Sequence, residues 1–525
     1  MWIQNSRPFL AGLLALSVTG VASAGDGPTV GLIEMSPDAA PGYTLFSPLN
    51  STPTYLIDND GRLVNSWTSD TFPVGNSVYL LEDGSLLRCS DQGPAEGSVM
   101  IGGGDGSNVK RYDWDGELTW DFSYNTTEVR LHHDICPIPG SSNVLMIAWE
   151  YKTEVEAIEA GRDPASISQG SLWPLHIIEV EPDGLNGGNI VWEWHVWDHL
   201  IQDFDPTKEN YGVVADHPGK IDINFFRNGN ADWIHANSID YNPDLRQIVI
   251  STPFLSEAWI ISHRTTTEEA AGPAGDLMYR WGNPRAYGRG VVEDQQFFFN
   301  HGVEFIPAGL PGAGNLIVFN NGNGRPDGAY STVEELTLPL NRKGTFDIDP
   351  GQAYGPSSAE ILFTGDPPTG FYSSGLSGAQ RLPNGNTLIC KGRNSGESAL
   401  GGFFSEITPS GDQAWLYVNP SGPAGILSQG DDPSGLQNVF ACFKYAPDYR
   451  GFKGRDMTPG LPIELYPKDF CPADINDDGM VDGADAGLLL ALWGEPGAGD
   501  LNDDGTTNGA DIGLMLAAWG LCEAP

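Results

Sequence analysis

Short apolar runs that alternate with glycine-containing turns dominate the first 465 residues. In the commonest form, an apolar run enters an Asp-Gly or Ser-Gly turn, and the run after the turn ends near a tryptophan. Paired runs joined by such turns are typical of β-hairpins. This phrase occurs at residues 55–67, 109–120, 177–194 and 404–415, and a second kind of hairpin occurs at 78–87 and 380–389.

Two successive hairpins make a four-stranded antiparallel unit, and such units recur between residues 42 and 445. About six copies fit this length, and repetition of this kind is the signature of a β-propeller, whose blades surround a central channel. We therefore predict an all-β fold, a six-bladed β-propeller, over residues 25–468. A pair of β-sandwiches would also explain the alternation, but not the recurring Gly-then-Trp phrase.

Insertions interrupt the fourth and fifth of these units. Residues 152–173, 197–232 and 265–289 are polar, loop-like and longer than ordinary connections. Long connections of this kind usually serve as lids or binding loops.

Histidines occupy a repeated position in three of the units. His132 and His133, His235, and His301 each stand shortly before a turn that leads into an apolar strand, at 144–148, 247–251 and 316–319. If the units close into a ring, side chains at one repeat position converge on its axis. Imidazole can act as a nucleophile, as a general acid or base, or as an anion partner when protonated. Three imidazoles can also bind Zn²⁺, and any single one can be purely structural.

Residues 469–525 have a different character, with two Asp-rich loops 26 residues apart. Oxygen-bearing side chains at loop positions 1, 3, 5, 9 and 12, with glycine at position 6 and a backbone carbonyl at position 7, predict two Ca²⁺ sites. Asp replaces the usual Glu at position 12. The predicted ligands are Asp474, Asn476, Asp478, Met480, Asp482 and Asp485 in the first loop, and Asp500, Asn502, Asp504, Thr506, Asn508 and Asp511 in the second.

The duplicated loop-and-helix pattern at 471–522 resembles a type I dockerin. The resemblance implies a small α-helical calcium-loop domain, with Ca²⁺ as its cofactor and a cohesin-like or cell-surface protein as a possible partner. Both copies carry Gly-Ala at loop positions 10 and 11 (483–484 and 509–510), where classical dockerins often carry hydroxyl residues.

The net charge and the N-terminus limit the possible partners and location. A formal charge of −42 argues against nucleic acid and anionic membranes as partners. Residues 1–24 read as a secretory signal peptide, with Arg7 before an apolar run at 9–21 and small residues at 22–24. That run is too short to span a bilayer. We expect a secreted, periplasmic or cell-surface protein without a transmembrane segment after cleavage.

Six cysteines are few for a secreted chain of this length. Cys471 and Cys522 bracket the C-terminal segment and suggest one disulfide. Cys89, Cys136, Cys390 and Cys442 lie far apart in the sequence, and their spacing allows three pairings or none.

The histidine segments resemble the active-site strands of bacterial aryl-sulfate sulfotransferases. Residues 42–465 share the resemblance, through Leu-His-His-Asp-Ile at 131–135, Trp-Ile-His-Ala-Asn-Ser-Ile at 233–239, Asn-His-Gly-Val-Glu at 300–304, and the segments 386–390 and 455–460. The resemblance implies a six-bladed propeller with its site at the central channel. It also implies transfer of a sulfuryl group from a phenolic sulfate donor to a phenol acceptor through a sulfohistidine, with neither a nucleotide donor nor a cofactor.

The resemblance also assigns roles by motif position. His301 would be the nucleophile, and His235 with His133, or its neighbour His132, would bind the sulfuryl oxygens in protonated form. Asn237 would line the site. The family usually has an arginine after the middle histidine, where this chain has Pro253. Lys391 and Arg393, which follow the strand at 387–390, are possible substitutes from another blade.

Two other classes of function fit the same pattern. A non-catalytic propeller that binds an anionic aromatic ligand or a sulfated glycan, tethered by its dockerin-like module, would not need the arginine. A quinone-cofactor dehydrogenase would share the propeller, but the chain lacks a carboxylate and tryptophan pattern specific to it.

Overall fold

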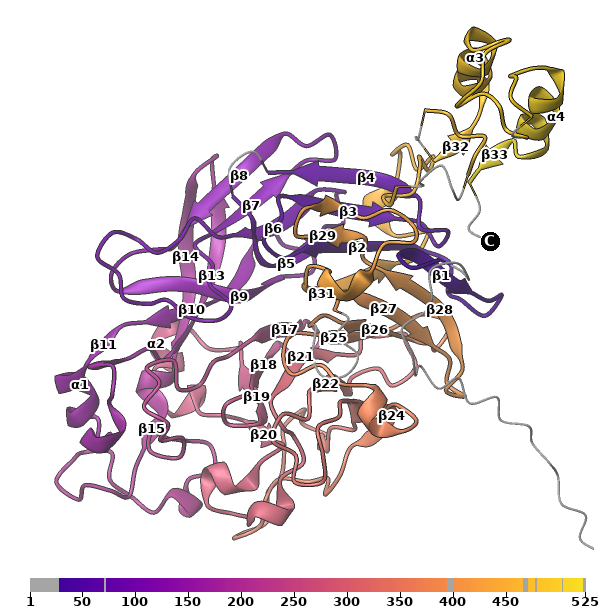
Figure 1. Ribbon diagram of the computed structural model, residues 1–525. Helices are drawn as coiled ribbons and strands as arrows, with labels where there is room; N and C mark the ends of the chain where they lie inside the picture. The colour runs from indigo at the N-terminus through magenta and orange to yellow at the C-terminus, as the bar shows by residue number, and fades with distance from the viewer. Residues whose placement is uncertain are drawn as a thin grey trace, which may run out of the picture.

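Six antiparallel sheets form a ring in the computed structural model of the chain (Figure 1). The structure describes residues 28–69, 72–393, 401–465, 471–476, 479–502 and 504–522. Each sheet is one blade with four strands, and the sixth blade carries a fifth strand. From the innermost strand outward, the first blade is β31 (Val439–Tyr445), β2 (Tyr43–Pro48), β3 (Pro53–Ile57) and β4 (Leu63–Thr68), and the second is β5 (Val74–Leu80), β6 (Leu86–Ser90), β7 (Asn108–Tyr112) and β8 (Leu118–Ser123). The third is β9 (Val129–Pro137), β10 (Val144–Glu150), β13 (Leu175–Asp183) and β14 (Gly187–His195), and the fourth is β17 (Ser238–Asn242), β18 (Gln247–Thr252), β19 (Glu257–Ser262) and β20 (Tyr279–Trp281). The fifth is β21 (Asn300–Phe305), β22 (Leu316–Asn320), β23 (Thr332–Leu336) and β24 (Glu360–Phe363), and the sixth is β25 (Gly378–Arg381), β26 (Thr387–Lys391), β27 (Phe403–Ile407), β28 (Gln413–Val418) and β1 (Gly31–Met35).

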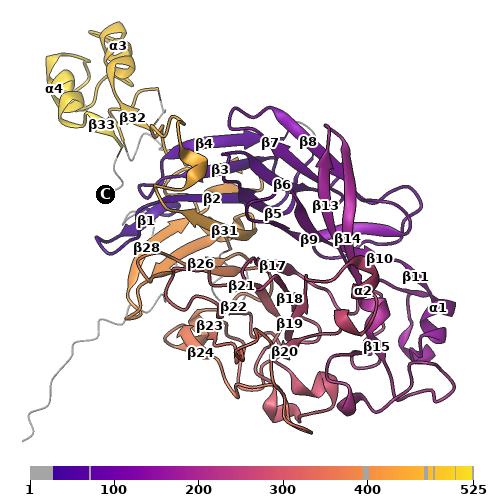
Figure 2. The ribbon, with the colours of Figure 1, turned by 180° about the vertical axis from the view of Figure 1, so that it is seen from behind.

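The innermost strands close the ring. They contact one another in the cyclic order β31, β5, β9, β17, β21, β25 and back to β31. Strands from the two ends of the propeller sequence share two blades: the late strand β31 pairs with β2 of the first blade, and the early strand β1 pairs with β28 of the sixth (Figure 2). The prediction of a six-bladed propeller is confirmed.

The predicted hairpins correspond to real strand pairs. The Gly-then-Trp phrases are β3–β4, β7–β8, β13–β14 and β27–β28, and the second kind of hairpin is β5–β6 and β25–β26. Gly61 and Gly116 have φ of 79° and 89°, a conformation that other residues rarely adopt. These turns fix the hairpin register, and therefore which side chains face the core.

A recurring tryptophan joins five of the six blades to the blade that follows. Each of these indoles is buried, and its Nε1 donates to a backbone carbonyl of the following blade. The bonds are Trp67 to Asp113 (2.8 Å), Trp120 to Gly187 (2.7 Å), Trp194 to Gly275 (2.8 Å), Trp281 to Pro356 (2.6 Å) and Trp415 to Asn59 (2.8 Å). A large apolar side chain with one donor therefore supplies both the packing and the orientation between blades.

The fourth and fifth blades are complete, contrary to the expectation that insertions degrade them. The segment at 265–289, expected to be loop, contains α2 (Thr267–Ala270) and the outermost strand β20. Three residues are too few for an alternating pattern to reveal that strand. The other two insertions carry only short elements, namely β11 (Lys152–Thr153), α1 (Glu154–Glu159), β12 (Ser171–Leu172), β15 (Leu200–Ile201) and β16 (Ile221–Asp222). A further hairpin, β29 (Ser421–Gly422) and β30 (Gly425–Ile426), precedes β31.

The C-terminal part forms a small lobe with two helices, drawn beside the ring in Figure 1. These are α3 (Gly483–Ala491) and α4 (Gly509–Ala517), and β32 (Met480–Val481) pairs with β33 (Gly520–Leu521). Asp482 and Asn508 cap the two helices through matching capping boxes. The predicted Cys471–Cys522 disulfide is present, and the other four cysteines are free and buried.

The structure limits the domain prediction in two places. Residues 1–24, which the signal peptide prediction covers, and Asp478 lie outside the described residues. The C-terminal lobe shows small helices, and its calcium role remains a prediction. Within the described part of the chain, every helix falls short of the length and apolar character needed to cross a membrane.

Candidate active site

The predicted histidines lie on the innermost strands of three consecutive blades, or directly before them. His132 and His133 are in β9, His235 precedes β17, and His301 is in β21. Pairing of β9 and of β21 with their neighbours shifts register next to the histidines, between Met146 and Ala148 and between His301 and Glu304. Bulges of this kind re-aim side chains next to a site.

His133 and His235 meet across the boundary between two blades. Their ring centroids are 4.6 Å apart at 83°. Both residues have positive φ, 53° and 56°, which is uncommon outside glycine. Backbone strain concentrates at functional sites, and two strained histidines in contact fit that pattern.

His301 is held in one orientation by Asn321. Its Nδ1 lies 2.8 Å from Asn321 Oδ1, while Asn321 Nδ2 donates to the carbonyls of Ser373 and Leu376 at 2.8 and 3.0 Å. Because both amide hydrogens of Asn321 are used there, its Oδ1 is the acceptor and His301 Nδ1 carries the proton. The lone pair of His301 is therefore on Nε2. Asn321 was missed in the sequence because a polar residue just after an apolar strand is a common turn signal.

His235 has a carboxylate partner that the sequence reasoning also missed. Its Nδ1 lies 2.5 Å from Asp232 Oδ2, and its backbone N–H donates to Asp232 Oδ1 at 3.1 Å. Trp149 Nε1 donates to the same Oδ1 at 3.0 Å. The spacing of three residues between Asp232 and His235 was visible in the sequence. The contact fixes the proton on Nδ1 of His235 and leaves Nε2 as its free nitrogen.

His132 stands behind His133. Its ring stacks on Trp149 with centroids 4.5 Å apart, and its Nδ1 lies 2.9 Å from His133 Nδ1. Of the two histidines predicted for this position, His133 contacts His235, and His132 contacts His133.

Asn237 does not line the site as predicted. It is fully buried, and its Nδ2 donates to the carbonyl of Asn300 at 3.0 Å. Ser251 Oγ donates to the same carbonyl at 3.1 Å. Because Asn300 directly precedes His301, Asn237 positions the backbone of the histidine from the neighbouring blade.

A glycine run covers the histidines. A Cβ on Gly104 would lie 2.1 Å from His133 Nε2, and one on Gly103 would lie 3.4 Å from His235 Cε1. The run is tied to β9, because His133 N–H donates to the Gly104 carbonyl at 2.7 Å and Arg130 pairs with Asp105 at 3.2 Å. Any larger residue at position 104 would displace the His133 ring.

Aromatic rings form a continuous row beside these histidines. Phe226 stacks on Phe254 at 5.1 Å, Phe254 stacks on His235 at 4.6 Å, and Phe299 lies 5.6 Å from Phe254 and 5.5 Å from His301. The three phenylalanines are half-buried. A row of partly exposed ring faces is a suitable surface for a flat aromatic ligand.

The position of the expected arginine is occupied by a turn. Pro253 and Phe254 lie between β18 and β19, and Phe254 contacts His235 there. Arg393, just past the end of β26, approaches the site from the sixth blade, two blades beyond the one that carries Phe254. Its guanidinium and the Phe299 ring both lie next to Gly375. A Cβ added to Gly375 would lie 3.3 Å from Arg393 Nη1 and 3.7 Å from Phe299 Cε1. Lys391 is buried, and burial lowers its pKa to about 8.

Burial keeps most of these imidazoles neutral. It lowers the pKa of His301 to about 3, against the opposing effect of the Asn321 hydrogen bond. Arg393 and His235 lower it further. Burial lowers the pKa of His132 to about 3, and burial together with His235, His132 and His301 holds the pKa of His133 well below its usual range. Burial, reinforced by these three imidazoles, therefore favours a neutral His133 over the protonated form that the resemblance implies.

The geometry also bears on the zinc alternative. In the described part of the chain, two groups bring three ligand atoms within 4.8 Å of one another: His176, Glu193 and His195, and the disulfide pair Cys471 and Cys522 with Asp474. The predicted site histidines, His132, His133, His235 and His301, are not among these groups.

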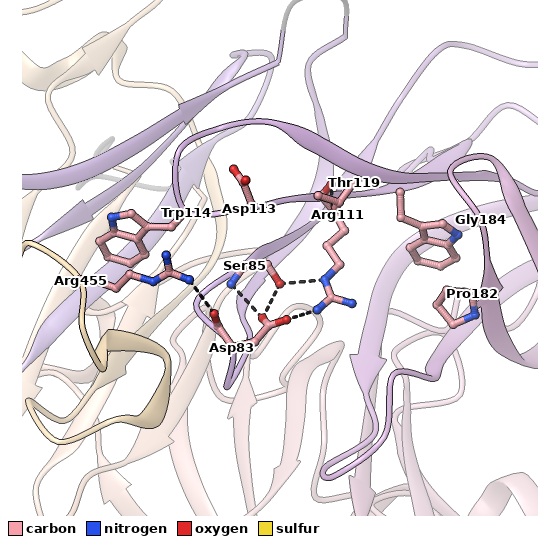
Figure 3. Close-up of a pocket in the computed structure, with 10 residues that line it drawn as sticks. Asp83, Ser85, Arg111, Asp113, Trp114, Thr119, Pro182, Gly184 and Arg455 are labelled. Carbon is pink, nitrogen blue, oxygen red and sulfur yellow. Dashed lines mark hydrogen bonds and ion pairs between the residues drawn. The ribbon is translucent and has the colours of Figure 1, made fainter.

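A surface pocket lies away from the histidines. A cavity of about 280 Å³ at the far end of the β5–β6 hairpin is lined by Asp83, Arg111, Trp114 and Arg455, among others (Figure 3). Arg111 Nε donates to Ser85 Oγ at 2.8 Å, and Arg455 Nη2 donates to the Asp83 carbonyl at 3.0 Å. Arg455 opens the segment at 455–460 that shares the family resemblance, and it stabilises this turn rather than contributing to the site.

The comparison with known families decides the class of the protein. The family described as arylsulfotransferase (ASST) matches residues 43–417, which is well over half of the chain and includes His132, His133, His235 and His301. The chain belongs to the arylsulfotransferase family. At the level of the family it is a sulfotransferase-like enzyme.

Other comparisons are more distant. No curated protein matches the chain. A solved structure of unknown function from Bacteroides caccae is 11% identical, with 77% of this chain and 98% of that chain covered and a TM-score of 0.39. The periplasmic gluconolactonase of Pseudomonas aeruginosa is 12% identical, with 77% and 99% covered and a TM-score of 0.35. Likeness at that distance carries no conclusion about function.

The C-terminal loops offer an oxygen-rich donor set. In the second loop, Asp511 accepts the backbone N–H of Leu501, Asn502 and Asn508, and Asp500 accepts that of Gly505. Asp504 Oδ2 receives the Asn502 amide at 3.0 Å, and Asn508 Nδ2 donates to the Thr506 carbonyl at 2.7 Å. The first loop repeats the contacts of its first and last positions, Gly479 N–H to Asp474 and Asp482 N–H to Asp485. These hard oxygen donors fit Ca²⁺ chemistry.

Proposed function

We propose that the chain transfers a sulfuryl group from a phenolic sulfate ester to a phenol through a sulfohistidine at His301, without a nucleotide donor. The observation that carries the proposal is the His301–Asn321 contact in a buried site, which leaves a neutral imidazole with its lone pair on Nε2. A nucleophile must be unprotonated at the attacking atom, and His301 meets that condition across the neutral pH range.

In the first step, the Nε2 lone pair of His301 attacks the sulfur of the donor. The N–S bond forms as the S–O bond to the aryl oxygen breaks, and the phenolate leaves with that electron pair. The Phe254 and Phe299 rings support an aryl group beside the sulfur. Arg393 supplies positive charge near His301, which offsets the negative charge on the sulfuryl oxygens.

In the second step, the acceptor phenol loses its proton to His235 Nε2 and attacks the sulfur. The O–S bond forms, the N–S bond breaks, and His301 recovers its lone pair. His235 then releases its proton to solvent, where it balances the phenolate released in the first step. Asp232 supports this role of His235, because a carboxylate on Nδ1 stabilises the imidazolium that forms. His133 contributes a neutral hydrogen bond to the sulfuryl oxygens rather than a charge.

The location and the C-terminal lobe extend the proposal. We infer that residues 1–24 direct secretion and that the two Asp-rich loops bind Ca²⁺, so that the lobe attaches the enzyme to a cohesin-like or cell-surface partner. The repeated ligand spacing and the matching capping boxes of α3 and α4 support this inference. A non-catalytic, ligand-binding propeller is the second candidate. It is not favoured, because the family match and the oriented nucleophile both point to chemistry.

One assay tests the proposed function. The protein is incubated with 4-nitrophenyl sulfate, with and without phenol, and both 4-nitrophenol and phenyl sulfate are measured. A transferase releases 4-nitrophenol continuously only with phenol present and forms phenyl sulfate in equal amount. Release that is independent of phenol would indicate a hydrolase, and the absence of any release across several aryl sulfates would favour the binding protein.

A further inference from the structure

A second histidine cluster lies on the outer half of the third blade, away from the central channel. His176 in β13 is the register partner of His195 at the end of β14. Their rings are stacked, with centroids 4.0 Å apart and an interplanar angle of 18°. Residues directly opposite on neighbouring strands present their side chains on the same face of a sheet, so the fold itself brings the two imidazoles together.

Two carboxylates complete the cluster. Glu193 Oε2 lies 3.0 Å from His176 Nε2 and 3.6 Å from His195 Nε2. Glu150, the last residue of β10, places its Oε2 3.2 Å from His195 Nδ1. Ligand atoms of His176, Glu193 and His195 all lie within 4.8 Å of one another.

Acidic side chains outnumber basic ones at this place. Two carboxylates, Glu150 and Glu193, stand beside the two imidazoles. Lys152 pairs with Glu150. Carboxylate oxygens that face imidazole nitrogens favour a bound cation.

Hydrogen bonding alone does not account for His176. The residue is 2% exposed, and its Nδ1 has no partner among the described residues. Buried polar atoms without a partner are uncommon, and each requires an explanation. The side chains of Glu193 and His195 are 33% and 27% exposed, so an ion can reach the cluster from solvent.

We propose that His176, His195 and Glu193, with Glu150 as a fourth ligand, bind one divalent transition-metal ion of the zinc class. Two imidazoles with carboxylates are the donor set that such ions prefer over Ca²⁺ or Mg²⁺. Glu150 and His195 are the residues at which the chain leaves the blade for the insertions at 152–173 and 197–232. A bound ion would join both points and hold the bases of the two insertions together.

Co²⁺ titration of the full-length, tag-free chain tests the proposal, with excess Ca²⁺ present to occupy the C-terminal loops. Tetrahedral Co²⁺ with nitrogen and oxygen ligands has a visible absorption band. Zn²⁺ should displace the Co²⁺ ion and remove the band. We expect one equivalent of Co²⁺ in the wild type, and loss of the band in His176→Gln, His195→Gln and Glu193→Gln. His217→Gln, at an exposed histidine of the second insertion, should keep it.

The controls separate this site from the predicted site histidines and from misfolding. His235→Gln should retain the band. Loss of the band in His235→Gln with retention of the band in His195→Gln would place the ion at the channel and overturn the assignment. A wild type that gives no band and shows no rise in Tm with Zn²⁺ would also overturn it. If the buried His176→Gln does not fold, the half-exposed His195 and Glu193 decide the outcome. Their circular dichroism without metal should match the wild type.

Discussion

Asn321 holds His301, the proposed nucleophile, in one orientation within a single blade. His301 Nδ1 donates to Asn321 Oδ1 at 2.8 Å, and the amide hydrogens of Asn321 are held by the carbonyls of Ser373 and Leu376. Asn321 therefore cannot turn its amide around. Asn321, which directly follows β22, thereby sets the tautomer of His301 in β21.

Replacement of Asn321 by alanine should lower kcat by about 100-fold, within the usual range for loss of a group that controls a catalytic proton. KM should change little, since Asn321 does not touch the substrate. Steady-state kinetics with 4-nitrophenyl sulfate and phenol measure both. Asn341→Ala, in a half-buried turn between β23 and β24, is the control and should behave as the wild type. An equal loss of affinity and rate would mean that Asn321 merely supports the fold.

The low pKa of His301 predicts an unusual pH profile. The neutral imidazole persists until the pH falls to about 3. Formation of the sulfohistidine should therefore show no loss with a midpoint near the ordinary histidine value of about 6.5. Asn321→Asp places a carboxylate next to Nδ1, raises the pKa of His301 and should introduce an acid limb. Single-turnover rates between roughly pH 5 and 8 compare the two proteins. A midpoint near 6.5 in the wild type that Asn321→Asp leaves unchanged would contradict the assignment.

We expect Arg393 to stabilise the negative charge on the sulfuryl oxygens, in place of the family arginine whose position Pro253 occupies. Arg393→Ala should reduce kcat/KM by roughly 100- to 1,000-fold, the scale of losing one donor to a developing negative charge. Arg393→Lys should recover part of the loss, because it restores charge without the planar donor pair. Arg342→Ala, in an exposed turn, is the matched control. Unchanged kinetics in Arg393→Ala would leave the sulfuryl oxygens to the imidazoles alone.

The C-terminal loops should bind two Ca²⁺ ions per chain. Asp511→Ala removes the last residue of the second loop and should reduce the stoichiometry from about two to one. It should also lower the temperature at which that lobe unfolds. Isothermal titration calorimetry measures the number, and Asp412→Ala in a propeller turn is the control. Stoichiometry that does not depend on Asp511 would place the ions elsewhere.

Much of the fold was predictable, because the propeller repeats its own sequence signals. Six copies of a hairpin pattern overcome the weakness of any one copy, and the Gly-then-Trp phrase marks the bond between blades. Strand β20 was not predictable, since Tyr279–Trp281 is too short to alternate. Its tryptophan, which bonds to Pro356 like the others, was the signal that could have identified it.

The site was predictable in its histidines but not in their partners. His133, His235 and His301 were found because they recur at one repeat position. Asn321 directly follows β22, and its contact with His301 depends on how β21 and β22 pair within one blade. Arg393 follows β26 in the next blade, and its proximity to His301 depends on how the two blades pack. The low pKa of His133 was not predictable, because burial among other imidazoles is a property of the closed ring.

Intact-mass analysis after rapid mixing with an aryl sulfate, without acceptor, tests the central claim most directly. The wild type should gain one sulfuryl group, lose it when phenol is added, and carry it on His301 after proteolysis. His301→Asn should gain none, while His217→Gln should gain the group as the wild type does. An adduct that persists in His301→Asn, or turnover by that variant, would contradict the account.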